Sequence, residues 1–230
     1  ESTDVACFGD CDGTIDTLSV SGGTPGYTFD WLDETGVSTG VTTPSISDLC
    51  AGDYILEVTD AAGCISFATG TVEEPDTILV NPLFVSDPLC NGNCDGFIIA
   101  NPIGGTLPFT FAWDDPLGQT TNGATDLCAG TYTVIMTDAN GCDVEQTATL
   151  IEPDAITIAI DSIIPATCQD ASDGAIYITT SGGEPDYTFE WVSETLIDTF
   201  TVEDPTGLLP MLYYLTITDD NGCQYFDTIA

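Results

Sequence analysis

Three stretches of the chain alternate between large apolar and small polar residues in the same order. The clearest covers residues 129–142, where Tyr132, Val134 and Met136 fall on one side and threonines with Ile135 on the other. The apolar set recurs as Tyr54, Leu56, Val58 and as Tyr213, Leu215, Ile217. A period of two residues is typical of a half-buried β-strand.

Each stretch closes on the phrase Asp-x-x-Gly-Cys. Ala62 stands where the other copies have Asn140 and Asn221, so only the glycine is shared and suited to a positive φ. The phrase predicts a hairpin with a type I turn and a glycine bulge.

Other landmarks recur at a spacing near eighty residues, including Trp31, Trp113 and Trp191. This period predicts an all-β chain of three tandem β-sandwich repeats, over residues 1–75, 76–153 and 154–230. The first repeat is expected to lack its opening strand and the third to end early, as in a window cut from a longer array. Linkers with proline between the repeats predict a stiff rod.

Within each repeat a cysteine loop ending in Asp-Gly leads into a strand, which ends at Gly-Gly. The first copy holds one extra residue between these marks, which predicts a bulge near Asp16 or Thr17 so that Leu18 and Val20 keep their side. The next strand carries three aromatic residues on one face, as in Tyr27-Thr28-Phe29-Asp30-Trp31. A sugar-stacking platform is one interpretation, but the alternation favours core packing.

The charge balance limits the classes of partner that the chain can bind. The chain has 38 acidic residues, no Lys, Arg or His, and a net charge of −38, while 43% of residues are hydrophobic. Periodic strands with this apolar content argue against disorder. Nucleic acid and anionic membrane surfaces are excluded as partners, because both are polyanions.

Ten cysteines at repeating positions, without a histidine to complete a zinc set, predict disulfides and an oxidising compartment. The third repeat has Ser172 and Leu209 where the others have a cysteine, and this joint loss suggests that the two missing cysteines are partners. The predicted pairs are Cys7–Cys64, Cys11–Cys50, Cys90–Cys142, Cys94–Cys128 and Cys168–Cys223. Redox catalysis through Cys-x-x-x-Cys is the rival interpretation, weakened by that loss.

Catalysis is not expected. General acid–base chemistry is left to carboxylates, and the recurring aspartates sit in turns in every copy. No cofactor is required, although calcium is a hypothesis because unpaired carboxylates in loops suit it. Its candidate ligands are Glu73, Glu74, Asp76, Glu152, Asp154 and Asp161.

Asp followed by Ser or Thr and an aliphatic residue resembles the O-glycosylation acceptor pattern of Bacteroidota. It marks Thr17, Thr77, Ser162 and Thr228.

The ordered set of Cys, Asp-Gly, Gly-Gly-Thr-Pro-x-Tyr-Thr-Phe-x-Trp, Ala-Gly-Thr-Tyr-Thr-Val, Thr-Asp-x-x-Gly-Cys and Glu-Pro resembles the SprB-type repeat. It is met three times over nearly the whole chain, with departures at the missing cysteine pair and at Gly26 and Asp186. Some phrases also resemble PKD-type modules, which implies an Ig-like sandwich by analogy.

The resemblance implies a very large cell-surface adhesin of gliding Bacteroidota, exported by type IX secretion. We therefore expect an extracellular, non-enzymatic stalk segment, whose partners are neighbouring repeats and, by resemblance, the secretion and motility machinery. The alternatives are a glycan-binding accessory module of a secreted polysaccharide-degrading enzyme and a subunit of an extracellular filament.

Overall fold

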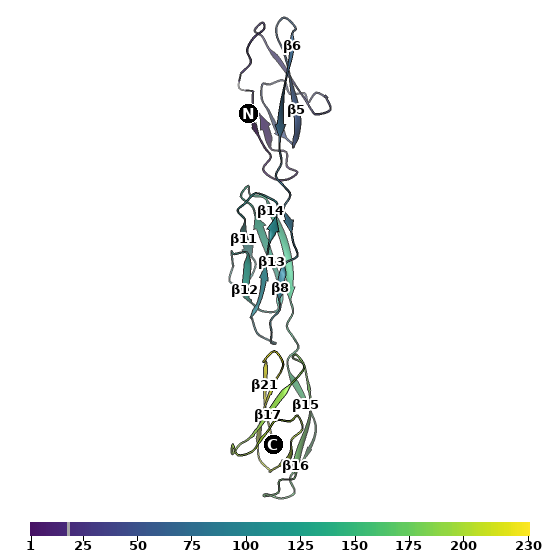
Figure 1. The fold of residues 1–230 in the computed structure, drawn as a ribbon, viewed down its shortest axis with the longest axis vertical. Helices are drawn as coiled ribbons and strands as arrows, with labels where there is room; N and C mark the ends of the chain where they lie inside the picture. Colours follow the sequence, from purple (N-terminus) through teal and green to yellow (C-terminus); the bar gives the residue numbers. More distant parts are fainter. Residues whose placement is uncertain (18) are drawn as a thin grey trace. The chain divides into compact units, whose positions relative to one another are not determined.

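A computed structural model describes residues 1–17 and 19–230, and in this part of the chain all regular structure is β-strand (Figure 1). The first repeat has two antiparallel sheets in the orders β1-β2-β4 and β3-β5-β6. Its strands are β1 Ser2–Thr3, β2 Gly13–Ile15, β3 Thr28–Leu32, β4 Ile46–Leu49, β5 Gly52–Thr59 and β6 Ile65–Val72.

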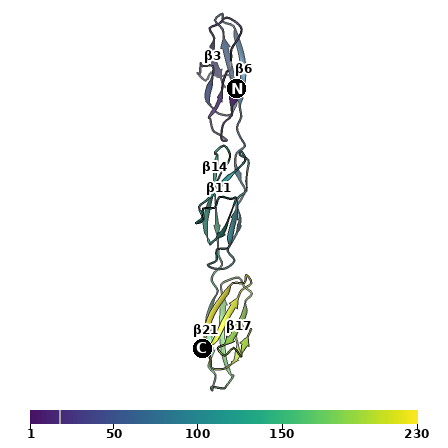
Figure 2. The same cartoon turned by 90° about the vertical axis from the view of Figure 1, so that its left-hand side faces the viewer.

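The third repeat follows the same plan with one more strand. Its sheets have the orders β15-β16-β19 and β18-β17-β20-β21, and Figure 2 shows β17 and β21 in one layer. The strands are β15 Thr157–Ile164, β16 Gly174–Ser181, β17 Thr188–Ser193, β18 Thr199–Phe200, β19 Thr206–Leu208, β20 Tyr213–Thr218 and β21 Gln224–Ile229. This division of strands between two sheets is that of an Ig-like sandwich.

The second repeat contains the sheets β8-β9-β12 and β11-β13-β14 and a short pair β7-β10. Its strands are β7 Leu79–Val80, β8 Phe84–Ser86, β9 Gly96–Ile99, β10 Pro102–Ile103, β11 Thr110–Trp113, β12 Gly123–Leu127, β13 Gly130–Thr137 and β14 Asp143–Leu150.

The chain divides into two compact units, and the division passes through the second repeat. The first unit comprises Glu1–Leu83, Ala100–Asn122 and Thr133–Thr147. The second comprises Phe84–Ile99, Gly123–Tyr132 and Ala148–Ala230. Each unit contains one complete terminal repeat and part of the middle one.

Most of the predicted inward residues are in the core, whereas Tyr54 and Val58 are half-buried and pack against it. Val134 and Met136 are fully buried, as are Leu215 and Ile217 in the third repeat, because successive side chains of a strand point to opposite faces. The three tryptophans are buried too, which confirms core packing over a sugar platform for these rings. Each indole N–H donates to a backbone carbonyl, on Thr43, Thr121 and Val202 respectively.

A tyrosine at the start of a central strand forms the corner typical of Ig-like domains. The Tyr54 hydroxyl donates to the Cys50 carbonyl and the Tyr132 hydroxyl to the Cys128 carbonyl, each at 3.1 Å. In the third repeat the Tyr213 hydroxyl instead accepts from the Leu209 N–H at 3.0 Å. Together with the sheet orders, these corners confirm the predicted fold class.

Two details of the first repeat differ from expectation. Its opening strand is present, because β1 pairs with β2 through Ser2 and Ile15 and through Thr3 and Thr14. Such pairing uses backbone groups alone, so a two-residue polar strand leaves no apolar signal in the sequence.

The predicted bulge near Asp16 or Thr17 falls just after β2 ends at Ile15, and Leu18 lies outside the described residues. The register between β2 and β4 instead shifts on the β4 side, beside Asp48, whose φ is +59°. The second repeat has the same device at Asp126, with φ +57°.

Candidate functional site at the repeat junctions

The cysteine loop has the same internal structure in all three repeats. An aspartate after the loop accepts the N–H of the residue before the first cysteine: Asp12 from Ala6, Asp95 from Leu89 and Asp173 from Thr167, at 2.9–3.1 Å. The carbonyl of the first cysteine accepts the N–H three residues later in each copy. The loop is therefore preformed by its own Asp-Gly ending.

The Asp-x-x-Gly-Cys turn is built around its aspartate. One carboxylate oxygen of Asp138 accepts the N–H groups of Asn140 and Cys142, and the other accepts that of Thr106, which follows Gly-Gly. Burial raises the pKa of Asp138, but these backbone donors outweigh burial and hold the pKa below its usual value.

The other two turns repeat this arrangement with Asp60 and Asp219. The bond from the Thr24 N–H is the largest of several that lower the pKa of Asp60. The turn glycines have φ values of +84°, +91° and +83° at Gly63, Gly141 and Gly222, as predicted.

The first junction joins the cysteine loop of the first repeat to the turn of the second. Cys7 and Cys142 form a disulfide with a Cα–Cα distance of 5.6 Å. Beside it, the Asn140 amide donates to the Ala6 carbonyl at 2.9 Å, and the linker carboxylate of Glu74 accepts the Gly9 N–H at 3.1 Å. These contacts hold the linker, the loop and the turn together.

The second junction repeats the first with equivalent residues. Cys90 and Cys223 form a disulfide with a Cα–Cα distance of 5.5 Å. The Asn221 amide donates to the Leu89 carbonyl at 3.0 Å, and Glu152 accepts the Gly92 N–H at 2.6 Å. A contact made twice by equivalent residues is a property of the repeat.

The linkers are also bound to the repeat that follows them. The Asp76 carbonyl accepts the Gly105 N–H, and the Asp154 carbonyl accepts the Gly183 N–H. A hollow of about 580 Å³ lies beside the first disulfide and one of about 430 Å³ beside the second. Both are lined by the linker, the cysteine loop and the turn.

These disulfides correct three of the predicted pairs. Cys11–Cys50 and Cys94–Cys128 are present as expected. The pairs Cys7–Cys64, Cys90–Cys142 and Cys168–Cys223 are wrong, because Cys7 binds Cys142 and Cys90 binds Cys223. Among the described residues, Cys64 and Cys168 are exposed free thiols.

The length of β5 explains the error. Cys50 precedes this strand and Cys64 follows it, and its eight residues span roughly 26 Å. The Cys11–Cys50 disulfide places the cysteine loop beside the start of β5, whereas Cys64 lies past its far end. Because a disulfide needs Cα atoms within about 7 Å, Cys7 cannot reach Cys64 in the same repeat.

The candidate calcium ligands have other roles where the structure describes their contacts. Glu74 and Glu152 accept loop N–H groups, and Asp161 accepts the Thr179 hydroxyl. Across residues 1–17 and 19–230, no three acidic or cysteine side chains gather in a group that could hold a metal ion. Calcium binding by Glu73, Asp76 or Asp154 remains an untested hypothesis.

The candidate glycosylation residues lie on several elements. Thr77, Ser162 and Thr228 are exposed, and Thr17 is half-buried. Ser162 is on β15 and Thr228 on β21. Their modification remains a prediction.

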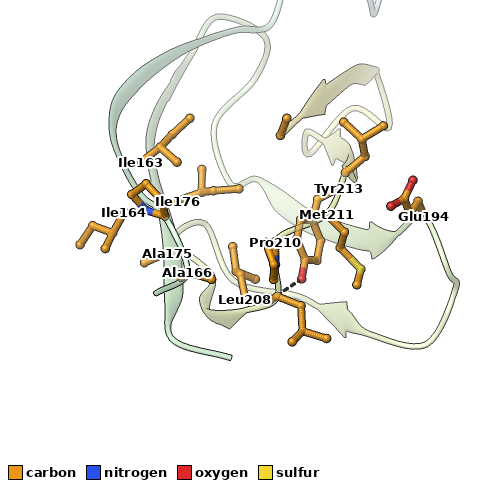
Figure 3. A pocket seen from close by; sticks show the side chains of 15 residues that line it. Ile163, Ile164, Ala166, Ala175, Ile176, Glu194, Leu208, Pro210, Met211 and Tyr213 are labelled. Carbon is orange, nitrogen blue, oxygen red and sulfur yellow. Dashed lines mark hydrogen bonds between the residues drawn. The ribbon is translucent and has the colours of Figure 1, made fainter. Parts of the chain in front are cut away.

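An apolar pocket of about 490 Å³ lies at the end of the third repeat, between β15, β16 and the segment before β20 (Figure 3). The Tyr213 hydroxyl and its hydrogen bond lie on its wall. In the first two repeats, Val72 and Leu150 are buried against Gly13 and Gly96, the equivalents of the pocket residue Gly174. The pocket thus corresponds to a core position of the other repeats.

Taken together, sheet order, tyrosine corner and buried tryptophan define a protein of tandem Ig-like repeats. The SprB repeat model matches residues 1–36, 83–118 and 161–194, one segment in each of the three repeats. No curated protein matches the sequence. None of the described residues forms a helix that is long and apolar enough to cross a membrane.

Several solved structures share a distant likeness. The eight N-terminal Ig domains of Down syndrome cell adhesion molecule match with 12% identity and a TM-score of 0.40, over 88% of this chain and 32% of that one. The insect immune protein hemolin matches with 12% identity and a TM-score of 0.30, over 98% and 72%. The BSP domain of a biofilm associated protein matches with 15% identity and a TM-score of 0.26, over 86% and 44%. The chain spans about a third of the first structure's length.

Proposed function

We propose that this chain is a stalk segment of a very large extracellular adhesin, in which its repeats transmit tension along the cell surface. The SprB repeats support a place in gliding motility and export by type IX secretion, which are the roles implied by that family. Disulfides and a surface without side-chain cations support an extracellular site.

The observation that carries the proposal is that disulfides join consecutive repeats. Cys7–Cys142 and Cys90–Cys223 overlap along the sequence, because Cys90 lies between Cys7 and Cys142. A cross-link confined to one repeat stabilises only that repeat. Overlapping cross-links instead give tension a shorter covalent route from each repeat to the next, in addition to the backbone of the linker.

This route is short. It follows Cys7 to Cys142, Cys128 to Cys94, and Cys90 to Cys223, and includes roughly 30 residues of backbone. Fully extended, the oxidised chain reaches about 125 Å between its ends, against about 800 Å for the reduced chain. Most of the polypeptide is thereby shielded from a pulling force.

Single-molecule force spectroscopy tests this function. The oxidised protein, held at Glu1 and Ala230, should stop extending near 125 Å, and reductant should release the remaining length. Disulfides within each repeat would leave roughly 65 residues in the route and a limit of about 240 Å. Extension to that length or beyond under oxidising conditions would contradict the proposal.

The choice of a stalk over a glycan-binding module has its own support. The buried tryptophans leave no exposed indole for sugar stacking among the described residues, which favours a stalk over a glycan-binding module. We expect no binding on a glycan array. Saturable binding of a polysaccharide fragment would favour the alternative.

A further inference from the structure

The two free cysteines occupy the positions that form the junctions elsewhere in the chain. Cys64 closes an Asp-x-x-Gly-Cys turn, as do Cys142 and Cys223, which are both bonded. Cys168 opens a cysteine loop, as do Cys7 and Cys90, which are also both bonded. Cys64 therefore belongs to the turn half of a junction of this type, and Cys168 belongs to the loop half of another.

Both halves keep hydrogen bonds seen in the complete junctions, but the Cys168 loop differs at Asp170, whose φ is not positive where the equivalent Gly9 and Gly92 have +81° and +77°. Asp60 accepts the N–H groups of Ala62, Cys64 and Thr24, as Asp138 does for its equivalents. Asp173 accepts the Thr167 N–H, and the Cys168 carbonyl accepts the Ala171 N–H, as in the two bonded loops. The turn half is preorganised, the loop half keeps two of the hydrogen bonds of the bonded loops, and both cysteines are exposed.

We infer that the Cys64 turn and the Cys168 loop are complementary docking surfaces for another SprB repeat, which each would bind through a disulfide of the junction type. With isolated copies of this chain, Cys168 of one copy then bonds to Cys64 of the next. Such a head-to-tail contact uses a different surface on each partner, so it can continue from copy to copy. The inference rests on the same junction geometry as the proposed function.

Bond formation requires an oxidant, for which a low-molecular-weight disulfide such as oxidised glutathione is sufficient. One protein thiolate attacks this disulfide and releases one thiol, and the second protein thiolate attacks the mixed disulfide and releases the other. The two cysteines lose two protons and two electrons, and the oxidant is reduced to two thiols.

The net charge of −38 on each copy opposes the encounter. Screening shortens the range of this repulsion to about 10 Å at 0.1 M salt and less above it. Coupling should therefore be tested in at least roughly 0.5 M NaCl, and its rate should fall steeply as the salt is removed.

Two single variants provide the test. Cys168→Ser leaves Cys64 as the free thiol, and Cys64→Ser leaves Cys168. Mixed with oxidised glutathione, they should form a dimer that migrates as such without reductant, and mass spectrometry should find Cys64 linked to Cys168. Each variant alone should stay monomeric. Equal dimer yields from the single variants would show unspecific oxidation, and the absence of a mixed dimer would also overturn the inference.

A gain-of-function variant tests the geometry. The first repeat has Ala62 where Asn140 and Asn221 donate a hydrogen bond across their junctions. At equilibrium with a glutathione redox buffer, Ala62→Asn should raise the yield of the Cys64–Cys168 dimer by roughly twofold to tenfold. This factor corresponds to the free energy of one added hydrogen bond. Ala62→Leu, which adds a side chain of similar size without a hydrogen-bond donor, is the matched control.

The same samples separate the two proposals. If Cys7–Cys142 and Cys90–Cys223 are found in the monomers but Cys64 and Cys168 do not couple, this inference fails and the proposed function stands. If the internal junction disulfides are missing, the proposed function loses its support as well.

Discussion

At the residue scale, the recurring aspartate of the turn explains two sequence phrases at once. Asp138 binds the N–H groups of its own turn and that of Thr106 after Gly-Gly. A Cβ on Gly105 would lie 2.8 Å from Ile78 and 3.1 Å from the Asp138 carboxylate, so the glycine is needed for this approach. Gly-Gly and Asp-x-x-Gly-Cys therefore recur together because they are two sides of one contact.

Replacing Asp138 should show this contact in the pH dependence of stability. Asp138→Asn keeps the shape but loses an anionic acceptor, and we expect a loss of about 2 kcal/mol at pH 7. Because the pKa of Asp138 is lowered in the folded state, its contribution is complete above the unfolded pKa of about 3.9 and is lost as pH falls below it.

The measurement is denaturant unfolding of both proteins at several pH values between 7 and 2.5. The stability gap should be constant above about pH 5 and close towards the acid end. Asp143→Asn, on an exposed residue of β14, should produce no gap. A gap for Asp138→Asn that does not change with pH would refute the electrostatic account.

At the element scale, alternation along single strands predicted the core well, since Tyr132, Val134 and Met136 are all buried. The joint loss of cysteine at Ser172 and Leu209 correctly identified the Cys11–Cys50 type of disulfide, because both partners of this disulfide lie in one repeat. The remaining pairs could not be found by elimination, which assumes that partners share a repeat. The length of β5 contradicts this assumption, because it separates Cys64 from the cysteine loop of its own repeat.

The Cys11–Cys50 disulfide should act only on its own repeat. Cys11→Ser with Cys50→Leu imitates the third repeat and removes a cross-link over 39 residues, worth about 3–4 kcal/mol in the chain-entropy model. Hydrogen exchange should accelerate at β2 and β5 and stay unchanged at β16 and β20. Cys64→Ser is the control and should leave all four strands unaffected, whereas acceleration throughout the chain would contradict a local role.

At the scale of the whole molecule, the chain has acidic charge without a cationic side chain to neutralise it. Stability must therefore come from packing, backbone pairing and disulfides, while the summed charge opposes the compact state.

Salt should consequently stabilise this protein at neutral pH. Raising NaCl from about 0.01 M to 0.5 M should increase the melting temperature steadily, because only repulsion is screened. Calcium chloride at matched ionic strength and low ion concentration is the comparison for a specific site: an additional, saturable rise would support the calcium hypothesis. A melting temperature that falls with NaCl would contradict the account.

The central claim is that disulfides cross-link consecutive repeats, and disulfide mapping tests it most directly. Trypsin has no cleavage site in this sequence, but cleavage before aspartate separates Cys7 from Cys11 at Asp10 and releases residues 138–142 as one peptide. In the unreduced protein, the peptide with Cys7 should be linked to that with Cys142. The peptide 87–94, which contains both Cys90 and Cys94, should be linked to the peptides with Cys223 and Cys128. A link from Cys7 to Cys64, or free thiols at Cys7 and Cys142, would contradict the account.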